Sequence, residues 1–281
     1  MSLNAHENDC VSEQIDWKAL QAAIMQGRTD TAKKLLDHAT NDNMESCDAG
    51  KALYYASMQG QEEVVRILLD KTEYIRIRPT YGGRALQSAS AAGYDRVVKM
   101  LLDTATLVDT ESDNYGKALH AAALSGHDEV VKILLDSGTP RDASRKHYGN
   151  ALVAAATRGH EVILESLLSS SSYPTFGSDY LGRALQAAAL EGREKSVEML
   201  LSRRADLNAN GEQFGRALQA ASTWGHKNIV KRLLESCSSA DVPHWGGALQ
   251  MAAANGHEGI VEMLLNADPK ATVDHGIHVP L

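Results

Sequence analysis

The feature that most constrains this 281-residue chain is an internal repeat of about 33 residues. An Ala-Leu pair, a glycine seven residues after it and a later Leu-Leu pair recur in constant phase. The Ala-Leu pairs begin at Ala19, Ala52, Ala85, Ala118, Ala151, Ala184, Ala217 and Ala248. The glycines are Gly27, Gly60, Gly93, Gly126, Gly159, Gly192, Gly225 and Gly256. One such unit is too short to bury its own apolar face, so stacked copies must share a core.

Residues 117–135, KALHAAALSGHDEVVKILL, predict two helices joined by a turn. The first half is rich in alanine, which favours helix and lets a neighbouring backbone approach closely. Gly126 can take the left-handed conformation that ends a helix. In the second half, Val130, Val131, Leu134 and Leu135 form the apolar stripe of an amphipathic helix.

Composition limits the classes of function. The net charge is −8 at pH 7, which argues against non-specific binding to nucleic acid or acidic membranes. The three cysteines, Cys10, Cys47 and Cys237, have no disulfide or metal-site spacing. The N-terminal residues lack the apolar stretch of a signal peptide. We therefore expect a cytoplasmic protein, with the nucleus as the alternative compartment, and no metal or cofactor.

The repeat resembles the ankyrin family, whose period is also 33 residues. Gly-His at 126–127, 159–160, 225–226 and 256–257 and the segment Ala205-Asp206-Leu207-Asn208 carry the match. The chain departs from the family at the usual Thr-Pro-Leu-His, where it has Ala-Leu-Gln, as in Ala184-Leu185-Gln186. This Ala-Leu-Gln-Ala-Ala variant is similar to ankyrin arrays of fungal proteins. The resemblance implies an all-α solenoid of helix–turn–helix units with short β-hairpin-like loops, and a role in binding.

The boundaries of the array follow from the columns. We expect residues 1–14 to be a mobile N-terminal segment and residues 15–281 to form a single solenoid of eight units plus the start of a ninth. Pro280-Leu281 lies in register for that ninth start. The alternative is that the chain is the recognition arm of a larger signalling protein.

Catalytic signatures are missing from the sequence, which contains no GxSxG, HExxH, CxxC or GxGxxG motif. Four of the eleven histidines occupy the Gly-His position, where a ring nitrogen can bond the neighbouring backbone. His120 instead takes a position that is glutamine in five other units. We interpret it as a structural residue, with partner recognition and catalysis as the alternatives.

A column of mostly basic residues directly precedes the Ala-Leu pairs. Its basic members include Lys51, Arg84, Lys117, Arg183 and Arg216. One interpretation is a solvated rim whose aliphatic stems cover the helix start. The other is a ladder of positive charge that contacts an acidic partner. Two residues earlier lie Tyr115, Tyr148, Phe214 and Trp245, which we expect to pack between the loops, with a role as contact aromatics at the loop tips as the alternative.

The two residues before each turn glycine vary, and we expect them to face the concave groove of the solenoid. Exposed apolar residues there mark a binding surface. The candidate binding residues are Leu124, Arg158, Leu190, Glu191 and Trp224. The alternative for these positions is partial burial against neighbouring helices.

The sequence therefore favours a non-enzymatic scaffold that binds a protein or peptide, including an acidic one, and neither nucleic acid nor membrane. The alternative from another class is a small-molecule enzyme, a cyclase or isomerase, with His120, Arg158 and Glu191 as acid–base groups. A closed, largely apolar pocket favours that alternative, and an open groove counts against it.

Overall fold

The computed structural model describes residues 16–38, 46–71, 79–104, 113–137, 144–169, 178–203, 212–236 and 244–267. Each of these eight segments contains two helices, and none of the described residues forms a strand. The architecture is thus the all-α helix-pair repeat that the sequence predicts. The N-terminal segment 1–14, the hairpin-like loops and the start of a ninth unit lie outside the described residues.

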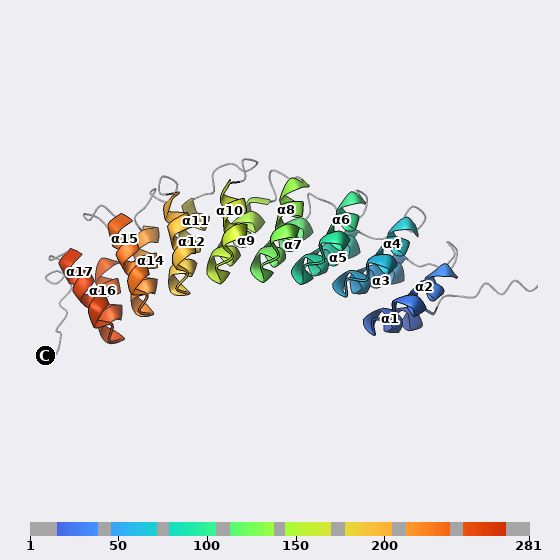
Figure 1. The fold of residues 1–281 in the computed structure, drawn as a ribbon, viewed down its shortest axis with the longest axis horizontal. Coiled ribbons are helices and arrows are strands. Elements are labelled where there is room, and N and C mark those ends of the chain that lie inside the picture. Colours follow the sequence, from blue (N-terminus) through green and yellow to red (C-terminus); the bar gives the residue numbers. More distant parts are fainter. Residues whose placement is uncertain are drawn as a thin grey trace, which may run out of the picture. The chain divides into compact units, whose positions relative to one another are not determined.

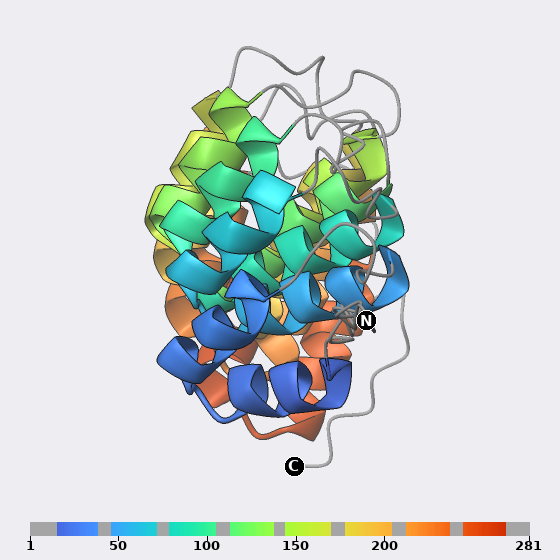
Figure 2. The same ribbon diagram turned by 90° about the vertical axis from the view of Figure 1, so that its right-hand side faces the viewer.

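The two helices of a repeat lie side by side, and in both views helices of neighbouring repeats of one unit do the same (Figures 1 and 2). The first helices are α1 (Trp17–Met25), α3 (Ser46–Met58), α5 (Pro79–Ala92), α7 (Asp113–Ser125), α9 (Ser144–Arg158), α11 (Ser178–Leu190), α14 (Glu212–Thr223) and α16 (Trp245–Ala254). The second helices are α2 (Thr29–Asp37), α4 (Glu62–Asp70), α6 (Asp95–Asp103), α8 (Asp128–Asp136), α10 (Glu161–Ser169), α12 (Glu194–Leu201), α15 (Lys227–Ser236) and α17 (Glu258–Ala267).

The chain divides into two compact units, Met1–Tyr115 and Gly116–Leu281. The boundary falls inside α7. In a repeat array each unit of structure contacts only its neighbours, so a compact group of repeats can form at any point along it. A single solenoid over residues 15–281 stays a prediction.

The turn between the two helices of a repeat depends on glycine. All eight turn glycines have a positive φ, between 66° and 82°. At Gly126 a side chain would also meet the next repeat, because an added Cβ would lie 2.5 Å from Cε1 of His160. This glycine therefore serves both the turn and the stacking of repeats.

The residue after the turn glycine joins several repeats to the one before. His226 Nε2 lies 3.1 Å from the carbonyl oxygen of Leu190, and His257 Nε2 lies 3.1 Å from that of Thr223. Arg193 in the same position donates from Nε to the carbonyl oxygen of Thr157, also at 3.1 Å. The structural interpretation of the Gly-His histidines is thus confirmed at His226 and His257.

A second column of glycines lies inside the first helices, directly before the basic column. At Gly149 an added Cβ would lie 2.3 Å from Cγ of Tyr180, so the ring of the next repeat packs on bare backbone. The same closeness recurs where Gly50 meets Tyr81, Gly83 meets Asn114, Gly116 meets His147 and Gly182 meets Gln213. These glycines set how closely neighbouring first helices approach.

The core consists mainly of alanine, leucine and valine from both helices of each repeat, as the columns predict. The aromatic column completes it, since Tyr115, Tyr148, Phe214 and Trp245 are all buried. The hydroxyl of Tyr148 donates to the carbonyl oxygen of Leu167 at 2.6 Å. The aromatic column therefore belongs to the core, and the hydrogen bond of Tyr148 joins the two helices of one repeat.

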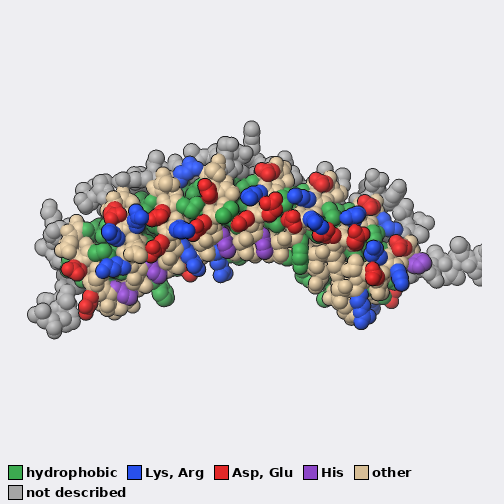
Figure 3. Space-filling view, in the orientation of Figure 1, with side chains coloured by type: hydrophobic (Ala, Val, Ile, Leu, Met, Phe, Trp, Pro, Cys, Tyr) green, Lys and Arg blue, Asp and Glu red, His purple; other side chains and the backbone are tan. Residues whose placement is uncertain are grey.

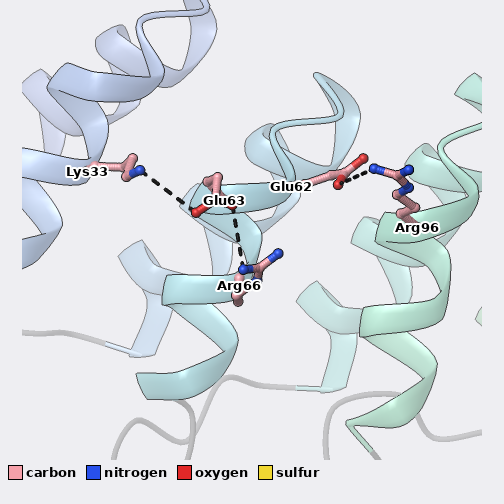
Figure 4. Close-up of polar contacts among 5 residues, drawn as sticks. All are labelled: Lys33, Glu62, Glu63, Arg66 and Arg96. Atoms are coloured by element: carbon pink, nitrogen blue, oxygen red, sulfur yellow. Dashed lines mark hydrogen bonds and ion pairs between the residues drawn. The ribbon is translucent and has the colours of Figure 1, made fainter.

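Ion pairs join the second helices of neighbouring repeats. In Figure 4, Glu63 pairs with Lys33 of the preceding repeat at 3.8 Å, and Glu62 pairs with Arg96 of the following one at 3.4 Å. All four side chains are at least one-third exposed, so each pair contributes at most about 1 kcal/mol. Their main effect is to neutralise charge on this face.

Gly149→Ala should destabilise the protein, although the higher helix propensity of alanine by itself predicts greater stability. The methyl group would push Tyr180 away from the helix, at a cost of about 1–3 kcal/mol in the free energy of unfolding. The measurement is urea unfolding followed by circular dichroism.

Gly259→Ala is the matched control, because an added Cβ there meets only the end of the Lys227 side chain, at 3.1 Å. This variant should gain up to about 1 kcal/mol from helix propensity. Equal effects of the two substitutions would contradict the stacking role of Gly149.

Candidate functional site

A pocket of about 410 Å³ lies across the first helices of repeats four to six, all within the second unit. It contains five of the residues that the sequence analysis selects: His120, Leu124, Arg158, Arg183 and Glu191. Asn150, Val153, Ala154, Thr157 and Arg193 complete its lining. Residues 71 positions apart in the sequence thus face one space.

The turns position the two charged residues that were predicted from the variable column. Arg158 is the last residue of α9 and Glu191 directly follows α11. Each precedes a turn glycine, Gly159 with φ 74° and Gly192 with φ 70°. Because the two turns have the same geometry and belong to neighbouring repeats, both side chains project toward the same pocket.

The charges of this pocket are not neutralised by neighbours. Among the described residues, the side chains of Arg158 and Glu191 make no ion pair and no hydrogen bond, and both are exposed. The guanidinium of Arg183 lies over the ring of Tyr180, with its Cζ 5.6 Å from the ring centroid. Three guanidinium groups therefore face one carboxylate.

His120 is half-buried at the edge of the pocket. Burial lowers its pKa below the ordinary 6.5, and His147 of the next repeat lowers the pKa further by repelling the protonated ring. At neutral pH the ring is therefore uncharged. It can give or accept a hydrogen bond there without adding charge to the pocket.

Three large apolar side chains are exposed on the same turns. Leu124 is 39% exposed, Leu190 is 41% exposed and Trp224 is 64% exposed. They belong to repeats four, six and seven, and Arg158 of repeat five lies between the first two. All three side chains reach solvent, Trp224 the most, while more than half of the surface of Leu124 and of Leu190 is covered; their role in binding stays a prediction.

The predicted basic ladder is mostly engaged with its own surroundings. Lys51 pairs with Asp48 at 3.0 Å, Arg216 pairs with Glu212 at 2.5 Å, and the Cζ of Arg84 lies 4.8 Å from the centroid of Tyr54. Lys117 is half-buried. Arg183 is the member that lines the pocket of repeats four to six. A binding role for the ladder stays a prediction, and its local contacts favour the structural interpretation.

A second pocket, of about 530 Å³, lies in repeats one and two. Lys18 and Lys51 line it together with Asp16 and Asp48. Its cations are thus balanced by carboxylates, and one of these, Asp16, caps α1 by accepting from the backbone N–H of Lys18 and Ala19. This pocket therefore offers less excess charge to a ligand than the pocket of repeats four to six.

The arrangement around His120 does not favour the enzyme alternative. His120, Arg158 and Glu191 do share one pocket, as the enzyme alternative requires, but the pocket is open to water and lined by polar as well as apolar groups. Water weakens the electrostatic stabilisation of a transition state. No cluster of three or more potential metal ligands occurs in the described segments. None of the helices described is long and apolar enough to cross a bilayer.

Comparison with known proteins identifies the class. Family models match residues 2–80 and 75–144 as "Ankyrin repeats (3 copies)", 185–234 as "Ankyrin repeats (many copies)" and 248–274 as "Ankyrin repeat". The chain therefore belongs to the ankyrin repeat family, whose members are generally protein-interaction modules. No curated protein matches it.

The solved structure of the human ASB11 ankyrin repeat domain is similar, with a TM-score of 0.58 and 22% sequence identity. The match covers 77% of this chain and 97% of that domain. At this identity the likeness concerns the fold.

Two features of the site escaped prediction from the sequence. The sequence shows a glycine directly before the basic column, as in Gly149-Asn150 and Gly182-Arg183. It does not show that this glycine touches the next repeat, because that contact is tertiary. Arg193 occupies the histidine position of its repeat and also lines the pocket. An alignment of the Gly-His positions shows that arginine replaces histidine at residue 193, and this difference could have marked Arg193 as a candidate.

The lowered pKa of His120 predicts a pH dependence of stability. The unfolded state takes up this proton near pH 6.5, while the folded state resists it. The stabilisation that depends on a neutral His120 is therefore complete above pH 6.5. It is lost as the pH falls toward the pKa of His120 in the folded protein. Urea unfolding at pH 7.5 and 5.5 should show a larger loss for wild type than for His120→Gln, which carries the residue of five other repeats. An equal or larger loss in the variant would contradict the assignment.

Proposed function

We propose that this chain is an interaction module that binds a protein or peptide along the turns of its second unit. The docking strip consists of Leu124, Arg158, Leu190, Glu191 and Trp224. Its support is that exposed apolar side chains and unpaired charges occur together on one series of turns. Exposed Trp and Arg are also the residue types that most often dominate binding energy. A cytoplasmic location, with the nucleus as the alternative, is part of this proposal.

The second helices provide the contrast that carries the proposal. Among the described residues several of their charges are paired between neighbouring repeats, as in Lys195 with Glu161 at 3.2 Å and Arg232 with Glu198 at 2.6 Å. Figure 3 shows side chains of both signs intermixed on the face it presents. Such a face is solvated and attracts neither sign strongly. The side chains of Arg158 and Glu191 in the docking strip are unpaired, so they can form ion pairs with a partner.

The test compares partner recovery by immobilised full-length chain. Arg158→Ala combined with Trp224→Ala should reduce recovery of specific partners about tenfold or more, because each side chain can contribute 1–2 kcal/mol or so. Quantitative mass spectrometry of the recovered proteins gives the ratio to wild type.

The matched control removes one exposed apolar and one exposed basic side chain from second helices of the same unit, Val162→Ala with Lys231→Ala. It should recover partners as wild type does. Thermal melts establish that both variants fold. Unchanged recovery by the strip variant, or an equal loss in the control, would overturn the proposed strip.

A further inference from the structure

The pocket of repeats four to six has an excess of positive charge in a chain whose net charge is −8. Arg158, Arg183 and Arg193 line it against the single carboxylate of Glu191. A guanidinium group presents parallel N–H donors that match the two oxygens of a carboxylate. The donor set is therefore suited to an acidic group from outside the chain.

Two of the three guanidinium groups are already oriented. The Nε of Arg193 donates to the carbonyl oxygen of Thr157 at 3.1 Å, and the terminal nitrogens of Arg193 have no partner among the described residues. Arg183 lies over the ring of Tyr180, which restricts its plane but uses none of its N–H donors. Preorganised donors lose less conformational entropy on binding. Arg158 completes the set as an exposed and unpaired cation.

Apolar side chains lie on both sides of these cations. Leu124 and Leu190 occupy the same position in repeats four and six, with repeat five and Arg158 between them. A ligand that uses both leucines has to continue in two directions from the carboxylate. This favours an acidic side chain within a peptide over a C-terminal carboxylate or a small free anion.

We propose, on the basis of the proposed docking strip, that this pocket binds the Asp or Glu side chain of an extended partner segment, with an apolar residue of that segment on Leu124 and another on Leu190. Repeats stack at roughly 10 Å, so the two leucines are roughly 20 Å apart. A segment in the extended polyproline II conformation rises about 3.1 Å per residue with three residues per turn, so side chains three and six positions apart project from one side and the two apolar residues are about six positions apart. The segment therefore has an apolar residue, an acidic residue about three positions later and an apolar residue about three positions after that.

Glu191 adds discrimination. It lies on the repeat-six side of the pocket, where it repels a second carboxylate in the partner. A partner with neutral or basic residues, instead of further acidic ones, on this side of its acidic residue fits better than an acidic run. Charge of this kind selects among partners more than it raises affinity.

The test uses fluorescently labelled, terminally blocked peptides and the full-length chain, with anisotropy as the readout. The probe is Leu-Ser-Ser-Glu-Ser-Ser-Leu, compared with the same peptide carrying Gln at its centre. A third peptide carries the central Gln and a free C-terminal carboxylate. Wild type should bind the Glu peptide at least tenfold more tightly than either of the others, with a preference that falls as NaCl rises from 50 to 500 mM.

The variant Arg158→Gln combined with Arg183→Gln should bind the Glu and Gln peptides equally, because two of the guanidinium groups that face the carboxylate are removed. Both side chains are exposed, so their loss leaves the core intact. The control Lys231→Gln with Arg232→Gln removes the same charge from a second helix and should keep the preference. Equal binding of the Glu and Gln peptides by wild type, or a preference that survives in the pocket variant, would overturn the carboxylate site. So would equal binding of the free-acid peptide.

The two proposals fail in different ways. Partner recovery that depends on Arg158 and Trp224, without any preference for the Glu peptide, would refute the carboxylate site and leave the docking strip standing. A Glu preference without dependence of partner recovery on Arg158 and Trp224 would refute the docking strip.

Discussion

The structure depends on the close approach of each repeat to the next over glycine. At Gly149 the ring of Tyr180 packs where a Cβ would otherwise lie, and at Gly126 the ring of His160 does the same. The close approach recurs at further interfaces, such as Gly60 with Tyr94 and Gly225 with His257, although no described atom lies within 4 Å of an added Cβ at Gly27. The shared core, the hydrogen bonds from the position after the turn and the alignment of the turns all follow from it.

Because the turns are aligned, residues at equivalent positions of neighbouring repeats lie next to one another on the surface. Arg158 and Glu191 are 33 residues apart, yet they line one pocket because their turns have the same backbone geometry. The scaffold positions thus tolerate little change, while the residues just before the turn glycines vary without disturbing the core. Variation on a fixed scaffold is what a recognition surface requires, since specificity comes from differences between side chains at equivalent positions.

The two sides of a repeat then differ in electrostatics. Second helices carry carboxylates early in the helix, where the dipole favours them, and cations of neighbouring repeats pair with these, as Lys195 does with Glu161. The pocket of the first helices has no such balance, because two of its arginines are held by a ring and a carbonyl group instead of by acids. Screened, paired charges contribute little, whereas unpaired charges beside exposed Leu124 can contribute to binding.

The sequence by itself determined the helix pairs, the turns at the eight glycines and the burial of the aromatic column, because these follow from local conformation and from a period that repeats. It also selected Arg158, Glu191 and Trp224, since variation among equivalent positions is visible without coordinates. Only the tertiary structure decided that Lys51 and Arg216 are paired locally, that Arg193 lines the pocket and that Gly149 leaves room for Tyr180. These facts depend on distances between neighbouring repeats, and a linear pattern records which residues recur but not how closely their side chains meet.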